Sequence, residues 1–545
     1  MKIKSLFAVL FLLLSFHTAT AQSIEQQIDA LFSEAYPADQ PGVTVLIAKD
    51  DQVIYRKAFG LANVELNIPM KPENVMELAS ITKQFTGVAI LMLKEQGKLS
   101  LQDPLSKYIA DYPKGHEITI HHLLNHTSGI KSYTNVPEFI TMARTDMTPM
   151  EIIEKFKDLP MDFEPGERYA YNNSGYILLG YIIEKASGVR YEDFIQNNIF
   201  DKLGMKNSYY GSKSRLISNR AAGYQNSQTG LQNADYLSMS LPYAAGSLMS
   251  TVDDMFLWHK AIHHNTLISE KSKQLAFTNY TLNNGKTINY GYGWGIDVLA
   301  DFHTIEHTGG IFGYATSGIY VPEKNIYAIA LSNIDDGSGP EVLNLKAVAI
   351  VLGKPLIDKP AVALSQEKLQ KWTGAYQFED VVRFITLKDG TLYSTREGGQ
   401  PFKLIPLSEN EFQFDGSFTT YEFSIENGKR TTMFADRINK SKGRETNKKP
   451  EPEKASISLS PESLLKFEGT YELHPSFHIE VSVLEDRIFA QATGQPQFEI
   501  FAESENTFFL KVVEAKMTFN KNPDGTIKSL TLFQGGQEIE GIKIK

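Results

Sequence analysis

Two hydrophobic patterns alternate along residues 24–353, one typical of strands and one typical of helices. β-Branched runs flank the polar pair Asp50-Asp51, so the segment from Gly42 to Gly60 is predicted to form a β-hairpin. Beyond it, apolar residues recur at steps of four, three and one, which indicates a helix with one face turned inward. This stripe consists of Ile81, Phe85, Val88, Ala89, Met92 and Leu93, and Gly97 is the predicted end of the helix.

The remainder of this region continues the alternation. Further helices are predicted near residues 120–124, 149–157 and 175–185, and a last amphipathic helix from about 340 to 352. Strand patterns recur near residues 292–297, 303–307, 318–320 and 326–332. Because strands lie at both ends of the region and helices lie between them, we expect an α/β fold with one sheet built from the two ends and helices on its faces.

From about Ala363 the pattern changes to short alternating strands separated by Gly, Asn and Asp turns, with little helix. The segment repeats itself: "WTGAYQF" begins at Trp372 and "FEGTYEL" at Phe467, with a spacing of 95 residues between equivalent positions. Each copy holds about six to eight short strands, which predicts two small antiparallel β-barrels, over residues 363–439 and 460–545. The charged, Pro-containing stretch between the copies has no apolar periodicity, so residues 440–459 are predicted to be a linker.

Composition and charge narrow the partners of this 545-residue chain. The formal net charge is −10, which argues against a nucleic-acid partner because phosphate binding needs clustered Lys and Arg. There is no cysteine, which excludes disulfides, a thiol nucleophile and cysteine-based zinc sites. Lys2 and Lys4, an apolar run and a small-residue site predict a signal peptide over residues 1–21, cleaved after Ala21, and therefore a periplasmic or secreted protein without a membrane span.

The candidate chemistry starts with "ELASITKQF", in which Lys83 follows Ser80 by three residues at the start of the predicted helix. Residues i and i+3 share one helical face, so the two side chains can touch if both point inward. A buried lysine with a lowered pKa can take the serine proton, and the serine N–H at a helix N-terminus can stabilise an oxyanion. On these residues alone, an N-cap serine with a surface lysine is the favoured interpretation.

Two further segments add to this pair. Tyr171 and Asn173, in "YNN", precede a predicted helix; a phenol beside a lysine can share its proton, and an amide can hold a substrate peptide bond. "HTGG" ends a strand, where glycines let a substrate backbone approach closely, and the Gly310 N–H is a candidate oxyanion donor opposite that of Ser80. A turn tyrosine with an N-cap asparagine, and a tight hairpin turn, are the purely structural alternatives for these two segments.

With these three motifs in this order, the chain resembles the penicillin-recognising serine hydrolases, which include class C β-lactamases, low-molecular-weight D,D-peptidases, esterases and D-aminopeptidases. Four other stretches fit the resemblance: "ITIHHLLNHTSGI" from Ile118, "LGM" from Leu203, "AAGSLMSTVDDM" from Ala244 and "YGYGW" from Tyr290. The resemblance implies a β-lactamase-like domain over residues 22–355, with an antiparallel sheet, helices on both faces and an all-helical subdomain. The two barrels would then be lipocalin-like.

The resemblance also implies roles. Ser80 would be the acyl-enzyme nucleophile, Lys83 its base, and Tyr171 the acid for the leaving group. Substrate contacts fall on Asn173, Thr308, Gly309 and Gly310, with the oxyanion hole formed by Ser80 and Gly310. No metal or cofactor is expected; the three histidines His121, His122 and His126 are interpreted as a structural element.

His307 departs from the lysine of the best-known β-lactamases, where a permanent cation binds a substrate carboxylate. Within the family this residue is typical of esterases and D-aminopeptidases, where it would line the site. A hydrolase domain followed by two barrels also resembles D-aminopeptidases. The leading expectation is therefore a secreted hydrolase of peptides or amides with D-amino acids; a broad carboxylesterase, a weak class C-type β-lactamase and a non-catalytic ligand-binding protein are the alternatives.

Overall fold

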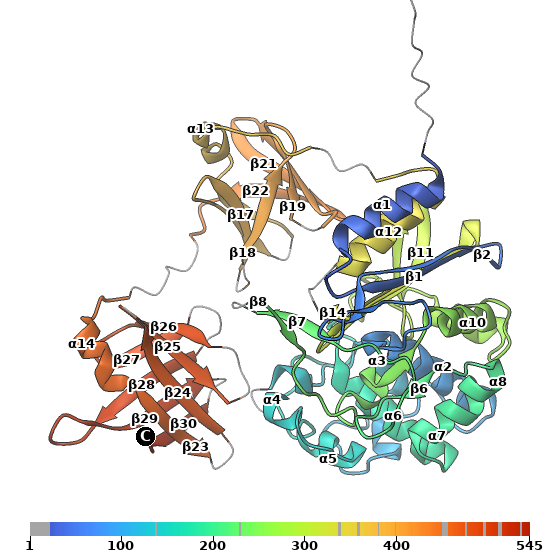
Figure 1. Ribbon diagram of the computed structural model, residues 1–545, viewed down its shortest axis with the longest axis horizontal. Helices are drawn as coiled ribbons and strands as arrows, with labels where there is room; N and C mark the ends of the chain where they lie inside the picture. The colour runs from blue at the N-terminus through green and yellow to red at the C-terminus, as the bar shows by residue number, and fades with distance from the viewer. Residues whose placement is uncertain are drawn as a thin grey trace, which may run out of the picture.

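The computed structural model describes residues 22–545 apart from 137–138, 228–229, 336–338, 357–359, 380, 398, 400, 416, 450–455, 475–476, 485, 494–496, 511–514 and 535–536. The predicted signal peptide therefore lies outside the described residues. The described chain forms an α/β domain followed by two closed barrels (Figure 1). Within the described residues, every helix is too short or too polar to cross a lipid bilayer.

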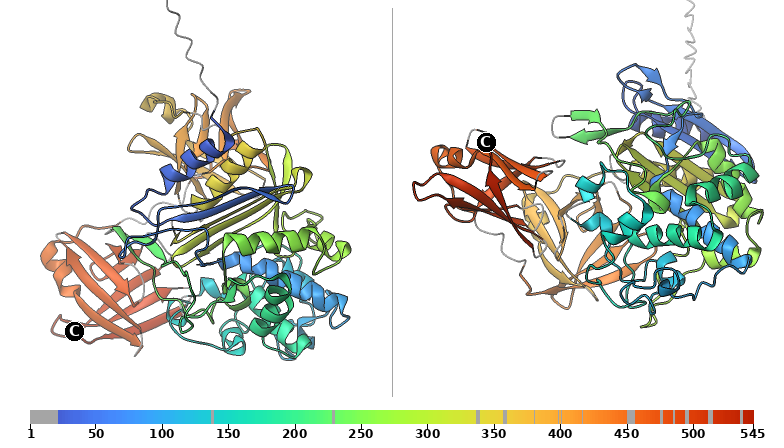
Figure 2. Two further views of the ribbon diagram at one scale, coloured as in Figure 1. Left: turned by 45° about the vertical axis from the view of Figure 1, so that its right-hand side comes forward. Right: turned by 90° about the horizontal axis from the view of Figure 1, so that it is seen from below.

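The α/β domain is built on one antiparallel sheet of six strands drawn from its two ends, as predicted. In spatial order the strands are β10 (Gly295–Leu299), β11 (Phe302–Ile311), β12 (Tyr314–Val321), β13 (Ile326–Ser332), β1 (Val43–Lys49) and β2 (Gln52–Phe59). The predicted hairpin is the β1–β2 pair, and Asp50 and Asp51 form its turn with positive φ angles of 51° and 61°. Figure 2 shows the sheet between two layers of helices.

One face of the sheet is covered by two helices from opposite ends of the domain, α1 (Ile24–Ala35) and α12 (Gly339–Val351). The other face packs against α2 (Thr82–Glu95), α10 (Val252–His263) and the helical subdomain. That subdomain contains α3 (Ile120–Leu124), α4 (Phe139–Met142), α5 (Pro149–Glu154), α6 (Asn173–Ser187), α7 (Tyr191–Ile195), α8 (Asp201–Leu203), α9 (Tyr243–Gly246) and α11 (Glu270–Ala276).

Short strands complete the domain. They are β3 (Leu61–Asn63), β4 (Ile68–Pro69), β5 (Met76–Glu77), β6 (Tyr209–Tyr210), β7 (Tyr224–Ser227), β8 (Gly230–Asn233), β9 (Leu248–Ser250) and β14 (Ile334–Asp335). Strand β9 pairs with β5, which ends two residues before Ala79. This pairing joins the segment that contains Ser80 to the segment that follows α9. These pairings set where the start of α2 lies.

Each C-terminal repeat closes into a barrel of eight antiparallel strands with a short helix at its start, α13 (Gln366–Gln370) or α14 (Pro461–Leu464). The first barrel contains β15 (Gly374–Gln377), β16 (Val382–Lys388), β17 (Thr391–Arg396), β18 (Pro401–Pro406), β19 (Glu411–Phe414), β20 (Thr420–Glu426), β21 (Lys429–Ala435) and β22 (Lys440–Thr446). The second contains β23 (Gly469–His474), β24 (Phe477–Leu484), β25 (Arg487–Ala492), β26 (Phe498–Ala502), β27 (Thr507–Leu510), β28 (Ala515–Lys521), β29 (Ile527–Gln534) and β30 (Gln537–Lys543).

The predicted linker over 440–459 is wrong in its first part, because Lys440–Thr446 is strand β22, which pairs with β15 and β21 and closes the barrel. The inward residue at its centre is Gly443, which lies against the ring of Phe378, while most of the charged residues around it stay exposed or half-buried. Because the inward residue is a glycine, the sequence shows no alternation of apolar residues here, although the backbone hydrogen bonds to both neighbouring strands are formed.

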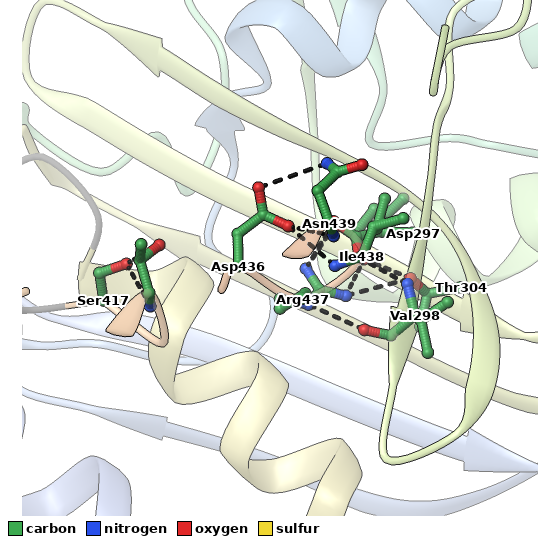
Figure 3. Close-up of polar contacts among 10 residues, drawn as sticks. Asp297, Val298, Thr304, Ser417, Asp436, Arg437, Ile438 and Asn439 are labelled. Carbon is green, nitrogen blue, oxygen red and sulfur yellow. Dashed lines mark hydrogen bonds and ion pairs between the residues drawn. The ribbon is translucent and has the colours of Figure 1, made fainter. Parts of the chain in front are cut away.

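The first barrel contacts the six-stranded sheet of the α/β domain through the turn between β21 and β22 (Figure 3). The guanidinium of Arg437 donates to both carboxylate oxygens of Glu306, at 2.8 and 3.0 Å, and to Thr304 Oγ1 at 3.1 Å. Its Nε donates to the carbonyl of Val298 at 3.1 Å. The side chains of Arg437 and Glu306 are only 14% and 15% exposed, so this bidentate pair is largely removed from water. We call this contact the Arg437 clasp.

Asp297 of β10 lies at the rim of the clasp, with a carboxylate oxygen 3.5 Å from the Arg437 guanidinium. Burial raises the pKa of Asp297 to about 6, although Arg437 opposes the shift. A carboxyl with a raised pKa in the folded state contributes stability at low pH that is lost as the pH rises through about 6.

We therefore expect Asp297→Asn to increase the free energy of unfolding at about pH 8, by on the order of 1 kcal/mol. The gain should disappear toward about pH 3, below the ordinary pKa of 3.8, where Asp297 is mostly protonated in both states. Thermal unfolding of both proteins across this range measures the effect. An equal gain at both pH values would contradict the assigned cause.

Candidate active site

Ser80 lies in a single 3₁₀ turn, Ala79–Ile81, directly before α2. Ala79 has a φ angle of +50°, a conformation that costs energy for a residue with a side chain and that is found at functional sites. The turn places half-buried Ser80 at the N-terminal end of α2, where the helix dipole is positive. Ser80 also lines a cavity of about 250 Å³.

Lys83 is completely buried one turn further along, and its Nζ contacts three oxygen atoms. It lies 3.0 Å from Ser80 Oγ, 2.9 Å from Asn173 Oδ1 and 2.9 Å from the carbonyl oxygen of Ala245. Burial holds the pKa of the Lys83 ammonium well below its ordinary range. A neutral amine donates two hydrogens, here to Asn173 and Ala245, and keeps a lone pair that can accept the Ser80 proton.

Tyr171 stands beside this pair. Its side chain is hydrogen-bonded to that of Ser80, and its ring centre is 4.9 Å from Lys83 Nζ. Although Tyr171 is 40% exposed, the surrounding protein raises the pKa of its phenol, and the hydrogen bond from Ser80 opposes that shift only in part. The phenol therefore keeps its proton at neutral pH and can donate it.

The two asparagines of "YNN", Asn172 and Asn173, have different roles. The helix α6 is capped by Asn172, whose side chain accepts from the Gly175 N–H. Asn173, the first helical residue, is thereby left to point its Oδ1 at Lys83, while its Nδ2 donates to Thr134 Oγ1 at 3.3 Å. The purely structural interpretation, an N-cap asparagine, applies to Asn172 and not to Asn173.

The "HTGG" segment lies in strand β11, beside the Ser80 turn. Gly309 is needed there: a Cβ would lie 2.5 Å from the carbonyl oxygen of Leu78 and 3.0 Å from the Cβ of Ala79. Gly310 has open space where a side chain would be, and it lines the same cavity as Ser80. Thr308 is exposed, and among the described residues neither it nor Gly309 lines that cavity.

His307 is a neutral, buried residue that bonds to its neighbours. Its Nδ1 donates to the carbonyl of Thr308 at 2.6 Å, which leaves Nε2 to accept from the Tyr290 hydroxyl at 2.9 Å. Burial lowers the pKa of His307 to about 3. The histidine is therefore uncharged at neutral pH, and its ring centre lies 6.1 Å from that of Tyr171. That His307 lines the site stays a prediction.

Sequence reasoning missed the group of rings that surrounds the catalytic pair. His126 is 1% exposed, and its ring centre lies 4.4 Å from that of Tyr171 and 4.7 Å from that of Tyr290. Its Nδ1 accepts from the Asn172 N–H at 3.1 Å. The "HTSG" and "YGYGW" stretches were part of the resemblance, so the signal was present, but no single residue in them had a predicted role.

The cavity in front of Ser80 is mostly apolar. Asp335 is the one acidic or basic residue among its described lining residues. The complete lining is Ala79, Ser80, Tyr133, Thr134, Phe139, Asn173, Leu237, Leu241, Pro242, Ala245, Gly246, Gly310, Ile311, Phe312 and Asp335, all from the first domain. Among the residues that the structure describes, no group of three metal-ligating side chains could hold a metal ion.

Comparison with known proteins agrees with this geometry. The family described as Beta-lactamase matches residues 28–352, and a domain of unknown function, DUF3471, matches residues 453–543. Penicillin-binding protein 4* of Bacillus subtilis is 31% identical over 431 residues, covering 74% of this chain and 94% of its own. Human mitochondrial LACTB, a serine beta-lactamase-like protein, is 26% identical over 56% of this chain and 73% of its own.

Solved structures show the same similarity. The octameric penicillin-binding protein homologue from Pyrococcus abyssi aligns with a TM-score of 0.55 and 30% identity, over 77% of this chain and 99% of its own. The D-amino acid amidase from Ochrobactrum anthropi SV3 shares the fold with a TM-score of 0.55, at 23% identity over 61% of this chain and 98% of its own.

The fold and the Ser80–Lys83 pair thus define a serine hydrolase. The chain belongs to the β-lactamase family, with two eight-stranded barrels after the family domain. The resemblance on which the sequence analysis rested is confirmed, as is the predicted fold class.

Proposed function

We propose that this chain is a secreted hydrolase that forms an acyl-enzyme at Ser80 and acts on peptides or amides whose acyl unit is an amino acid with a free amino group, D-amino acids in particular. The observation that carries the proposal is the 3.0 Å contact between Ser80 Oγ and the Nζ of a completely buried lysine. Secretion rests on the pattern of residues 1–21 alone.

In the first half of the reaction, Ser80 Oγ attacks the substrate carbonyl carbon while its proton passes to neutral Lys83. The carbonyl oxygen becomes an oxyanion, which the N–H groups of Ser80 and Gly310 would stabilise in this proposal. As the tetrahedral intermediate collapses, the C–N bond breaks and the leaving amine takes a proton from the Tyr171 phenol. The Lys83 ammonium then gives its proton to the Tyr171 phenolate, whose ring centre lies 4.9 Å from Lys83 Nζ.

In the second half, a water molecule attacks the ester carbonyl of the acyl-enzyme. Neutral Lys83 accepts the water proton and returns it to Ser80 Oγ as the C–O bond breaks. The products are a carboxylic acid and the regenerated serine. The depressed pKa of Lys83 keeps its amine neutral and ready for both halves.

Charge in and around the cavity supports an amine-bearing substrate. Asp335 attracts an ammonium group, and the neutral His307 provides no cation to bind a substrate carboxylate. β-Lactams and D,D-peptide substrates carry such a carboxylate, so they are disfavoured here. The apolar residues of the lining, among them Phe139, Leu241 and Phe312, suit a hydrophobic side chain on the acyl unit.

A carboxylesterase is the second candidate. The same nucleophile and oxyanion donors would cleave an ester, and the mainly apolar cavity accepts an acyl chain without an amine. Purified protein should be assayed on D- and L-amino-acid p-nitroanilides, p-nitrophenyl esters and nitrocefin, with Ser80→Ala as the blank. Highest kcat/KM on a D-amino-acid p-nitroanilide supports the proposal; highest kcat/KM on simple esters or nitrocefin replaces it.

Asp335→Asn is expected to raise KM about tenfold for a D-amino-acid p-nitroanilide, which corresponds to ~1.4 kcal/mol of lost attraction. The reason is that the neutral amide no longer attracts the substrate ammonium. The matched control is the N-acetylated substrate, which has no ammonium and should keep or improve its KM. Equal effects on both substrates would contradict a role for Asp335 in amine recognition.

A further inference from the structure

The Arg437 clasp holds the part of the hydrolase sheet that has the fewest neighbours. Strand β10 lies at the edge of the sheet and pairs with β11 alone among the strands of that sheet. The clasp spans both strands, because Arg437 bonds to Val298 of β10 and to Glu306 of β11. The barrel thus supplies to this edge the lateral contact that another strand would otherwise give.

The same strand carries groups of the active site. Glu306 directly precedes His307, and the alternation of a strand places their side chains on opposite faces of the sheet. Glu306 is paired with Gly295, and Gly295 forms a bridge with Tyr290, whose hydroxyl bonds to His307. Further along β11, Gly309 contacts the Ser80 turn and Gly310 faces the cavity.

Without the guanidinium this edge would be strained by like charges. Asp297 is opposite Thr304 in the β10–β11 ladder, so it is the diagonal neighbour of Glu306 on the same face. Glu341, at the start of α12, lines the same interdomain cavity as these two carboxylates. Arg437 lies 2.8 Å from Glu306 and 3.5 Å from Asp297 and supplies one positive charge to this group from the barrel side.

We propose that Arg437 is a positioning residue for the active site: the first barrel, through its clasp on Glu306, holds β11 at the distance from the Ser80 turn that the Gly310 oxyanion donor requires. The barrel is then a structural part of the catalytic unit, in addition to any role in ligand binding. The expected effect on kcat rests on the proposed function, whereas the expected effect on hydrogen–deuterium exchange in β11 does not.

The test compares Arg437→Gln with Arg430→Gln in the full chain. Arg430 is the control, because it lies in the same barrel and forms an ion pair with Glu445, and its described contacts are inside that barrel. Its side chain is 28% exposed, against 14% for Arg437. Active sites are counted with a fluorophosphonate probe, and kcat is expressed per labelled site on a p-nitrophenyl ester. Hydrogen–deuterium exchange is followed in Phe302–Ile311, which is strand β11.

For Arg437→Gln we expect a fall of about tenfold in kcat per labelled site with little change in KM, since a small displacement of the oxyanion donor acts on the transition state. Exchange in β11 should become faster. Millimolar guanidinium should restore part of the kcat through the cavity of about 640 Å³ beside the clasp, and Arg437→Lys should restore only part because it cannot bond in a bidentate way. Arg430→Gln should match wild type in all three measurements.

Unchanged exchange in β11 of Arg437→Gln overturns the proposal, whatever the activity. So does an equal loss in the two variants, which would mean that any weakened barrel has this effect. If wild type is not labelled by the probe, the proposed function fails, and the exchange comparison still decides the role of Arg437.

Discussion

Replacing Lys83 with methionine is expected to lower kcat by on the order of 10³-fold or more on every substrate that the enzyme accepts, with the fold retained. The Lys83 amine is the one base described within hydrogen-bonding distance of Ser80 besides the Tyr171 phenol, which keeps its proton at neutral pH. Methionine is unbranched and fills the buried channel of the lysine side chain without a titratable group. Circular dichroism and steady-state kinetics measure the two parts of this prediction.

Lys83→Arg is the matched control, since it keeps a positive charge but cannot become neutral. It should be as inactive as Lys83→Met if the neutral amine is the base. Substantial activity in Lys83→Arg would mean that Lys83 acts only through its charge. Turnover by Lys83→Met close to that of wild type would end the proposed mechanism altogether.

Gly309→Ala is the second change with a large expected effect. The added Cβ would lie 2.3 Å from Thr316 Oγ1 and 2.5 Å from the carbonyl oxygen of Leu78, closer than real side chains approach. Strand β11 would have to move away from the Ser80 turn. We expect a loss of about 1–3 kcal/mol in the free energy of unfolding and a fall in kcat of about 10²-fold.

The neighbouring Gly310→Ala separates crowding from the general cost of adding a methyl group. Its Cβ would meet no atom within 4 Å, because it points into open space. The melting temperature of Gly310→Ala should therefore stay close to that of wild type, while that of Gly309→Ala falls. Equal melting temperatures for the two variants would show that the close contact with Leu78 is easily relieved.

The sequence predicted those features that depend on near neighbours along the chain. The β1–β2 hairpin follows from alternation around two aspartates, and the α2 stripe follows from helical spacing, which also puts Ser80 and Lys83 on one face. The two barrels follow from an internal repeat. Strand β22 was missed because its inward residue is Gly443, which gives no hydrophobic signal.

What Lys83 does chemically is decided by the tertiary structure. Complete burial lowers its pKa, and the oxygens of Asn173 and Ala245, which lie 90 and 162 residues away in the sequence, hold its amine in place. The backbone conformation makes Asn172 the N-cap of α6. Asn173 is therefore available to contact Lys83. Sequence spacing predicts contacts between near neighbours along the chain, and it does not predict contacts between residues this far apart.

By itself the sequence determined the order of elements, the family and the residues able to do the chemistry, because spacing and residue type are local properties. The tertiary structure alone decided that His307 is neutral and bonded to Tyr290, that β11 approaches the Ser80 turn at Gly309, and that Arg437 reaches Glu306 from another domain. The physical reason is that desolvation and charge pairing depend on what surrounds a group in space, and those surroundings come from segments distant in sequence.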